Sequence, residues 1–92
     1  MTPSLTPSLC ETLARISSPD DMRAVLVDLC TPAELRALSE RWRVAELLAD
    51  DLSYREINAQ TGVSTTTIGR VARFLRDEPH GGYRLMLDLA KD

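Results

Sequence analysis

The chain has 92 residues, of which 43% are hydrophobic and only 4% aromatic, and its formal net charge is −3. This length fits one small domain with a largely aliphatic core, which gains stability when two copies of the chain share it. The negative charge argues against a nonspecific, strongly basic coat for nucleic acid.

The spacing of the two cysteines and the absence of long apolar stretches argue against a metal-binding or redox protein and against a membrane protein. Cys10 and Cys30 match neither a metal-binding spacing nor a C-x-x-C redox motif, so we expect both to act as small apolar side chains. The apolar stretches are too short to cross a membrane, and the first residues do not resemble a secretion leader. The sequence therefore predicts a cytoplasmic protein with no membrane contact, cofactor or metal.

The first residues predict a flexible arm followed by a short helix. Thr-Pro-Ser-Leu occurs twice, at 2–5 and 6–9, and each proline removes a backbone donor and restricts the residue before it. We expect residues 1–8 to be a flexible N-terminal arm. A short amphipathic helix is expected to follow from about Ser8 to Ile16.

Helix-start signals mark the next two helices. Ser18 and Pro19 predict a capped helix that runs to about Leu29. Its expected buried residues are Met22, Val25, Leu26 and Leu29. Thr31 and Glu34 form a capping box, which predicts a longer helix over 32–49. The apolar residues of this helix repeat at three- and four-residue steps and predict one buried stripe of Leu35, Leu38, Trp42, Ala45 and Leu48.

A second capping box opens the next part of the chain. Ser53 and Glu56 are three residues apart, and they predict a short helix over 53–60. A turn is expected at 61–63, and a further helix over 64–77, capped by its first serine.

The end of the chain predicts one more helix. Residues 79–82 contain proline and two glycines and break the chain. The last helix is expected over about 83–90, with Leu85, Met86 and Leu89 available for packing. Because no strand pattern appears anywhere, the sequence predicts an all-α fold of about six helices.

The segment 57–70 has the pattern of a helix-turn-helix. Gly62 lies where the turn requires a positive φ, which glycine adopts without steric cost. Val63 is placed to fill the angle between the two helices. The apolar positions expected on the buried faces are Ile57, Ile68, Val71 and Leu75.

This arrangement leaves small residues at the exposed amino end of the second helix, namely Ser64, Thr65, Thr66 and Gly69. Recognition helices present such residues to base edges in the major groove, where hydroxyls donate or accept and threonine methyls contact thymine methyls. Three consecutive threonines are poor helix formers, which favours a functional reason for them. The candidates for phosphate contacts, which position the protein without reading sequence, are Arg55, Arg73 and Arg76.

Charge is distributed unevenly along the chain. Residues 53–76 hold four arginines and one glutamate, so this segment carries +3 and the remainder −6. One basic segment on an acidic body suits a selective DNA-binding protein, although a solvated helix face explains the same charges. The two helices also have a purely structural interpretation, as a hairpin within a bundle.

Five segments carry a resemblance to a known family. They are TPAELRAL at 31–38, RWRVAELL at 41–48, LSYREI at 52–57, TIGR at 67–70 and GGYRLML at 81–87. Together they make residues 31–92 resemble the Trp repressor superfamily, and especially its YerC/YecD-like branch. Asn58 agrees with this resemblance, because most helix-turn-helix proteins place a small alanine there, whereas this family tolerates a polar side chain.

The resemblance implies an intertwined homodimer of six-helix chains that represses transcription by binding operator DNA. Residues 9–92 are then one domain, in which 9–49 form dimerisation helices, 53–76 the helix-turn-helix and 83–90 the C-terminal helix. Dimeric helix-turn-helix proteins hold their recognition helices about one DNA turn apart, roughly 34 Å.

The resemblance carries over the family's ligand site only in part. The namesake repressor holds tryptophan between two arginines, at positions that match Arg41 and Arg70. Val71 stands where the namesake has glycine, and Phe74 stands where it has a serine that contacts the ligand. Both larger side chains fill space that an indole ring needs, so we expect no response to tryptophan.

Two explanations for Arg41 and Arg70 stay open. One is a site for a different anion. The other, which we favour, is structural pairing with carboxylates such as Glu46 or Asp50. The sequence does not name a small-molecule effector.

Two rival functions remain beside the DNA-binding one. An enzyme is not expected, because His80 is the only histidine, lies beside two glycines, and no cysteine or serine has an evident activating partner. The second rival is a protein-interaction module that keeps the fold without operator binding. The partners that the sequence predicts are double-stranded DNA and a second copy of the chain.

Overall fold

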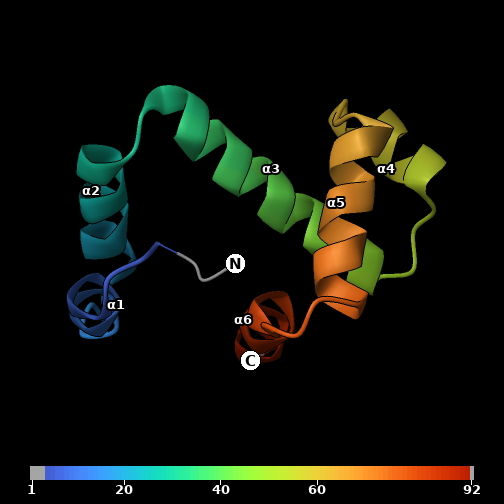
Figure 1. The fold of residues 1–92 in the computed structure, drawn as a ribbon. Coiled ribbons are helices and arrows are strands. Elements are labelled where there is room, and N and C mark those ends of the chain that lie inside the picture. Colours follow the sequence, from blue (N-terminus) through green and yellow to red (C-terminus); the bar gives the residue numbers. More distant parts are fainter. Residues whose placement is uncertain (1–3, 92) are drawn as a thin grey trace. The chain divides into compact units, whose positions relative to one another are not determined.

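The computed structural model describes residues 4–91, which form six helices and contain no strand (Figure 1). The helices are α1 (Pro7–Leu13), α2 (Pro19–Leu29), α3 (Pro32–Ala49), α4 (Tyr54–Thr61), α5 (Thr65–Arg76) and α6 (Gly82–Ala90). The predicted all-α class is confirmed. Within residues 4–91, no helix is both long and apolar enough to cross a membrane.

The chain divides into two compact units within the first turns of α3. One unit ends at Leu35 and holds α1 and α2, and the other begins at Arg36 and holds most of α3 with α4, α5 and α6. The assignment of residues 9–92 to a single domain stays a prediction.

Helices α1 and α2 each begin at a proline, and the side chain of the residue before it caps the helix. Thr6 Oγ1 accepts a hydrogen bond from the Leu9 amide at 3.1 Å, and Ser18 Oγ accepts one from the Asp21 amide at 3.3 Å. Proline suits the first helical position, because an amide there would have no partner within the helix.

The first helix begins earlier and ends sooner than predicted. It starts at Pro7, so part of the expected arm over 1–8 is helical, while residues 1–3 lie outside the described chain. It ends at Leu13 rather than at Ile16. The Ile16 amide bonds to the Leu13 carbonyl three residues back, which is the tighter spacing that often terminates a helix.

Neither α1 nor α2 contains a buried residue. Three residues expected to be buried are only half-buried, namely Met22, Val25 and Leu26. Leu29, also expected to be buried, is 56% exposed, and Val27 of the same helix is 52% exposed. The prediction for Leu29 is therefore wrong within one chain, and these helices gain little from hydrophobic burial by themselves.

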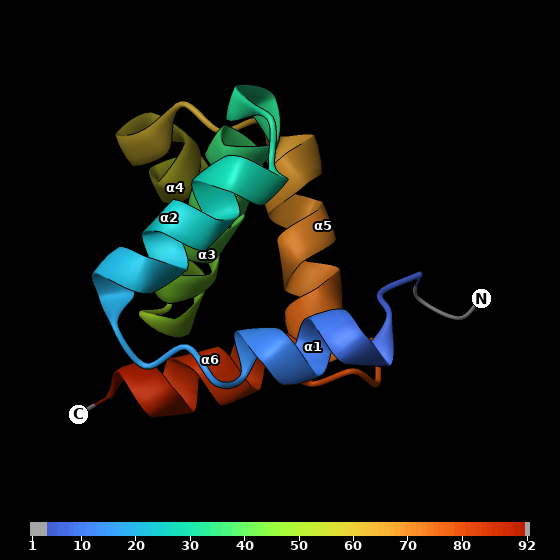
Figure 2. The ribbon, with the colours of Figure 1, turned by 90° about the vertical axis from the view of Figure 1, so that its left-hand side faces the viewer.

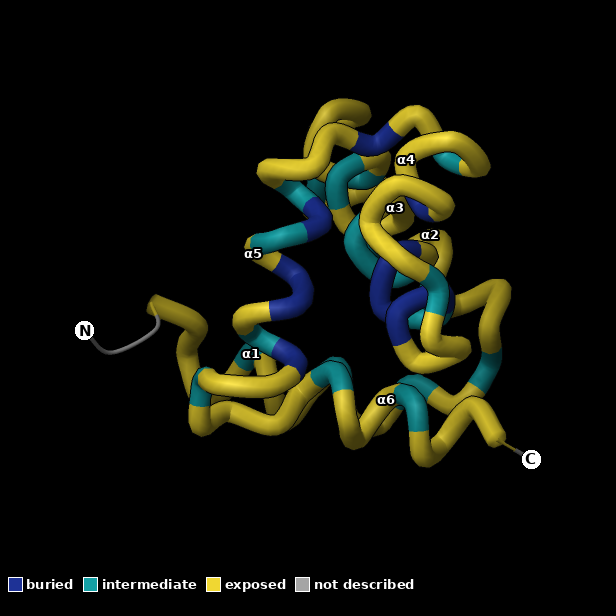
Figure 3. The backbone as a smooth tube through the Cα atoms, turned by 90° about the vertical axis from the view of Figure 1, so that its right-hand side faces the viewer, coloured by how far each residue is buried: buried dark blue, intermediate teal, exposed yellow. Residues whose placement is uncertain are grey.

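The hydrophobic core lies in the second unit and is aliphatic, as the composition predicts. Its buried residues are Val44, Ala45, Leu47, Leu48, Ile57, Val63, Ile68, Val71, Ala72 and Leu75. Their positions on α3 and α5 are the dark blue stretches in Figure 3. Leu38 is 46% exposed, so the stripe predicted for 32–49 is buried only in its second half.

The packing face of α6 differs from the prediction. Tyr83 and Leu87 pack against the core, whereas Leu85, Met86 and Leu89 are 61%, 47% and 69% exposed. Residues four apart share one face of a helix, so the first pair faces the core and the other three lie on another side. The isolated chain therefore leaves an apolar face of α6 uncovered.

Both predicted capping boxes are formed. Glu56 Oε1 accepts the Ser53 amide at 3.0 Å while Ser53 Oγ accepts the Glu56 amide at 3.1 Å, and Thr31 and Glu34 make the matching pair at 2.7 and 3.2 Å. Hydrogen bonds with the capping residues Thr31 and Ser53 lower the pKa of Glu34 and Glu56, respectively, below the ordinary value of 4.5. The bond with the backbone of the capping residue has the larger effect, and the bond with its side chain the smaller one. Both bonds lower the pKa because they favour the charged carboxylate.

Acid is expected to weaken the fold as these two glutamates become protonated. A carboxyl whose pKa is lowered by folding stabilises the folded state above its ordinary pKa of 4.5, and that contribution is lost as pH falls through the folded-state pKa. Thermal unfolding followed by circular dichroism between about pH 6 and pH 3 should show this loss. A Glu34→Gln/Glu56→Gln variant keeps the amide oxygen as acceptor and should lose less; equal pH dependence in both proteins would contradict the assignment.

Candidate nucleic-acid interface

Helices α4 and α5 contact one another and are joined by a short turn (Figure 2). Gly62 ends α4 with φ +73° and ψ 0°, and its amide donates to the Asn58 carbonyl at 2.8 Å. This left-handed conformation favours glycine. A Cβ at Gly62 would meet nothing within 4 Å, so the backbone angle rather than lack of space requires glycine here.

Two side chains of α4 hold the turn in place. Asn58 Nδ2 donates to the Val63 carbonyl at 2.9 Å. Thr61 Oγ1 donates to the Ile57 carbonyl at 2.7 Å and accepts from the Val63 amide at 3.1 Å. Val63 itself is buried, as predicted for the residue that fills the angle between the helices. These three hydrogen bonds were not predicted, although asparagine and threonine side chains beside a turn glycine often bond to nearby backbone.

At the amino end of α5, some side chains form hydrogen bonds that cap the helix, and others are exposed without such bonds in the described chain. Ser64 Oγ accepts the Thr67 amide and donates to Thr67 Oγ1, both at 3.2 Å, so Ser64 and the half-buried Thr67 stabilise the helix start. Thr65 and Thr66 are exposed, and neither hydroxyl has a hydrogen-bond partner within the described chain. At Gly69 a Cβ would meet nothing within 4 Å.

One face of α5 carries the candidate residues in a defined order. Thr66, Gly69, Arg70 and Arg73 are spaced by three, four and seven residues, so they share one side of the helix. The opposite side is buried and consists of Ile68, Val71, Ala72 and Leu75. The exposed face therefore runs from a hydroxyl group at its amino end to positive groups in its later turns.

Within residues 4–91, the arginines of α4 and α5 form no ion pair with a carboxylate. Across residues 4–91, the ion pairs join Arg43 to Glu46 at 3.6 Å and Lys91 to Asp88 at 3.7 Å. Exposed side chains without such a pair include the three predicted phosphate ligands, Arg55, Arg73 and Arg76. Their donors are available to an anion outside the chain.

The favoured pairing of Arg41 and Arg70 with nearby carboxylates is not observed. Glu46 pairs with Arg43, three residues before it, whereas Arg41 is five residues before it and lies on another side of α3. Arg70 instead lies over the ring of Phe74, with its guanidinium carbon 4.6 Å from the ring centroid. Binding of a different anion by Arg41 and Arg70 stays a prediction.

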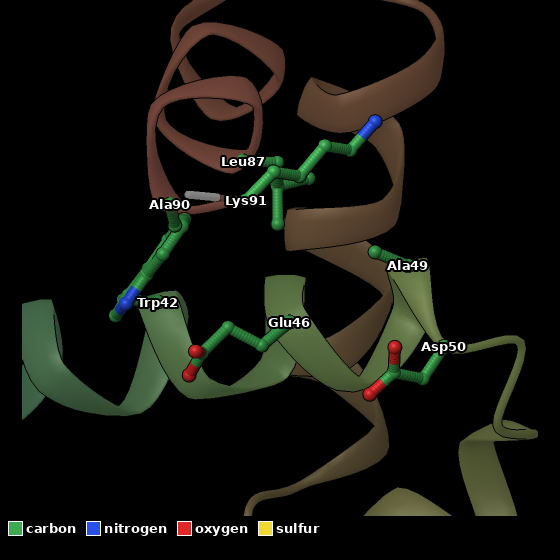
Figure 4. Close-up of a pocket in the computed structure, with 7 residues that line it drawn as sticks. All are labelled: Trp42, Glu46, Ala49, Asp50, Leu87, Ala90 and Lys91. Atoms are coloured by element: carbon green, nitrogen blue, oxygen red, sulfur yellow. The ribbon is translucent and has the colours of Figure 1, made fainter.

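A surface pocket of about 260 Å³ lies between α3 and α6. It is lined by Trp42, Glu46, Ala49, Asp50, Leu87, Ala90 and Lys91. In Figure 4 the charged ends of Glu46, Asp50 and Lys91 lie apart from one another. Small-molecule sites instead bring a few polar groups together on one ligand. The surface formed by α4 and α5 is the stronger candidate.

Comparisons with known proteins identify the family of this chain. The family model for the Trp repressor protein matches residues 6–90. A solved structure of a TrpR like protein from Eubacterium eligens ATCC 27750 matches 91% of this chain and 87% of its own, with a TM-score of 0.80 and 32% identity.

Two curated relatives match at similar identity. The Trp operon repressor homolog of Xylella fastidiosa (strain 9a5c) is 39% identical over 70 residues, which cover 75% of this chain and 76% of that protein. The uncharacterized protein YerC of Bacillus subtilis (strain 168) is 40% identical over 65 residues, which cover 71% of this chain but only 62% of YerC. The family match spans nearly the whole described chain, and the resemblance inferred from the five sequence segments is confirmed. This chain belongs to the Trp repressor family.

Proposed function

We propose that this chain is a sequence-specific DNA-binding transcriptional regulator, a repressor that acts as a homodimer through a helix-turn-helix formed by α4 and α5. Membership of the Trp repressor family supports a regulatory role in DNA binding rather than an enzymatic one. The observation that carries the proposal is the exposed face of α5. There, exposed threonine hydroxyls and a glycine with open space beside it are followed by arginines that pair with no carboxylate of the described chain.

The residues of this face have different roles in the proposed DNA binding. Thr65 and Thr66 enter the major groove, where their methyl and hydroxyl groups contact base edges, and Gly69 lets the helix backbone approach the groove floor. Ser64 was also predicted to contact bases, but its hydroxyl oxygen already caps α5, so its role beside DNA is secondary. The phosphate contacts come from Arg55, Arg73 and Arg76.

A second copy of the chain covers the apolar surface that one chain leaves exposed. The large exposed apolar side chains include Val27 and Leu29 on α2 and Leu85, Met86 and Leu89 on α6. Single exposed apolar residues are ordinary, but each of these two helices exposes more than one large apolar side chain. Because α1 and α2 contain no buried residue, we assign them together with α6 to the subunit interface.

The regulator we propose acts in the cytoplasm and does not respond to tryptophan. Phe74 occupies one face of Arg70, where an aromatic ligand would otherwise stack. The identity of any other effector does not follow from this arrangement.

Removing the predicted phosphate contacts should weaken DNA binding for all sequences alike. The variants Arg55→Gln, Arg73→Gln and Arg76→Gln should each lower affinity and reduce the slope of log affinity against log salt by about 1. The probe is a duplex selected by the wild-type protein from a random pool, with binding followed by fluorescence anisotropy at several salt concentrations. Arg36→Gln, an exposed arginine of α3 outside the α4–α5 pair, is the matched control and should leave the slope unchanged.

Selection also tests the proposal as a whole. A two-fold symmetric consensus in the retained duplexes supports readout by a dimer. A folded dimer that retains no duplex would overturn operator binding and favour the protein-interaction module instead.

A further inference from the structure

Phe74 lies in an unusual setting on α5. The guanidinium carbons of Arg70 and Arg73 lie 4.6 and 5.2 Å from the centroid of its ring. The ring of His80, in the segment before α6, stacks at 6.2 Å between centroids with 18° between the planes. Three cationic or titratable side chains therefore surround one phenyl ring.

Core packing does not account for this ring. Phe74 is half-buried, and the half-buried side chains that pack against the core are Trp42, Leu52, Tyr83 and Leu87. Its ring contacts are made with the two arginines of α5 and with His80 of the following loop, and it also lines a surface pocket with Tyr83, Leu85 and Met86 of α6. A residue that only filled the interior would not need two arginines beside it.

The position of the two arginines leaves their donors free. An arginine that lies over an aromatic ring interacts through the flat face of the guanidinium, while its five N–H groups point outward from the edge of that plane. Neither Arg70 nor Arg73 has a carboxylate within ion-pair distance in the described chain. Both side chains thus lie over the ring without a carboxylate partner in the described chain, on the same face of α5 as Thr66 and Gly69.

We propose that Phe74 is a positioning residue for DNA binding, which orders Arg70 and Arg73 in advance so that they contact phosphates beside the groove that α5 enters. This inference rests on the proposed function. A long arginine side chain loses rotational freedom when it binds a phosphate, and ordering it before binding removes part of that cost. Arg70, predicted as an anion ligand, then binds a DNA phosphate rather than a small molecule.

The test compares two substitutions at position 74, one of which is made in two backgrounds. Phe74→Leu keeps an apolar side chain without the ring and should weaken binding to the selected duplex by about 3- to 10-fold. Phe74→Tyr keeps the ring and should bind within about 2-fold of the wild-type protein. Phe74→Leu is then made in an Arg70→Gln/Arg73→Gln protein. Binding is measured at low salt, where the remaining phosphate contacts keep it measurable. In this background Phe74→Leu should lower the affinity by less than about 2-fold. Unfolding midpoints of all variants are measured alongside.

Each result decides between two roles for the ring. A loss confined to the background that contains both arginines, with recovery in Phe74→Tyr, supports the positioning role. An equal loss in both backgrounds, no loss at all, or no recovery in Phe74→Tyr overturns it and leaves operator binding intact. If the wild-type protein retains no duplex from the random pool, the proposed function fails and this inference fails with it.

Discussion

Replacing Thr66 by aspartate is expected to lower the affinity for the selected duplex by about 100-fold or more, because a like-charge contact costs several kcal/mol. Thr66 is exposed in the first turn of α5, where the proposed interface meets the DNA. A carboxylate there faces the negative groove and phosphates. The same carboxylate is favourable for the helix, since acidic groups in a first turn interact well with the helix dipole. The affinity for the selected duplex should therefore fall strongly, while the unfolding midpoint stays unchanged or rises.

The matched control is Thr66→Asn, which has nearly the shape of aspartate without its charge. Fluorescence anisotropy with the selected duplex and thermal unfolding by circular dichroism measure the two effects on the same samples. Asparagine should retain most of the affinity that aspartate removes. Undiminished binding by Thr66→Asp would place the DNA elsewhere on the protein.

The second large effect is expected on the outward face of α6. Leu89 is 69% exposed in one chain, and a substitution at an ordinary surface position changes stability by no more than about 0.5 kcal/mol. If a second copy covers this side chain, Leu89→Asp instead places a charge in an apolar interface. We expect a loss of at least about 2 kcal/mol and dissociation of the dimer. Light scattering after size exclusion, and unfolding at several protein concentrations, measure both.

Arg84→Asp provides the comparison on the same helix. Arg84 is exposed, and it lies one position before Leu85 on the polar side of α6 with Asp88. Its replacement should leave the dimer intact. A Leu89→Asp protein as stable and as dimeric as wild type would show that this face is simply solvent-exposed.

Local signals in the sequence predicted the elements well because the physics that sets them is local. The pairs Thr31–Glu34 and Ser53–Glu56 bond within one turn of backbone, so their spacing alone fixes where α3 and α4 begin. Gly62 likewise adopts the left-handed conformation that its place in the turn requires. Such features do not depend on what the rest of the chain does.

The errors concern contacts that depend on which neighbour covers a side chain. Periodicity showed that Leu29 and Leu89 belong to apolar faces, but it does not say whether the covering surface lies in the same chain. Pairing of Arg41 and Arg70 with carboxylates such as Glu46 was the favoured alternative, although helix geometry brings Glu46 to Arg43 instead.

Among the contributions to the candidate site that were not predicted are those of Asn58 and Phe74. Asn58 holds the turn through the Val63 carbonyl, although the sequence analysis noted only that a polar residue is tolerated there. Phe74 was treated as a ring that fills space, and its position beside two arginines follows from side-chain directions that a linear pattern does not contain.

Gly69 affects the outcome of any selection of this protein for higher thermal stability. Glycine inside a helix costs about 0.5–1 kcal/mol relative to alanine, and a methyl group at this position would touch nothing in the chain. A library screened for heat resistance alone would therefore enrich alanine at position 69. Under the proposed function, the more heat-resistant proteins would lose the close approach of the α5 backbone to DNA, so thermal stability and DNA binding must be selected together.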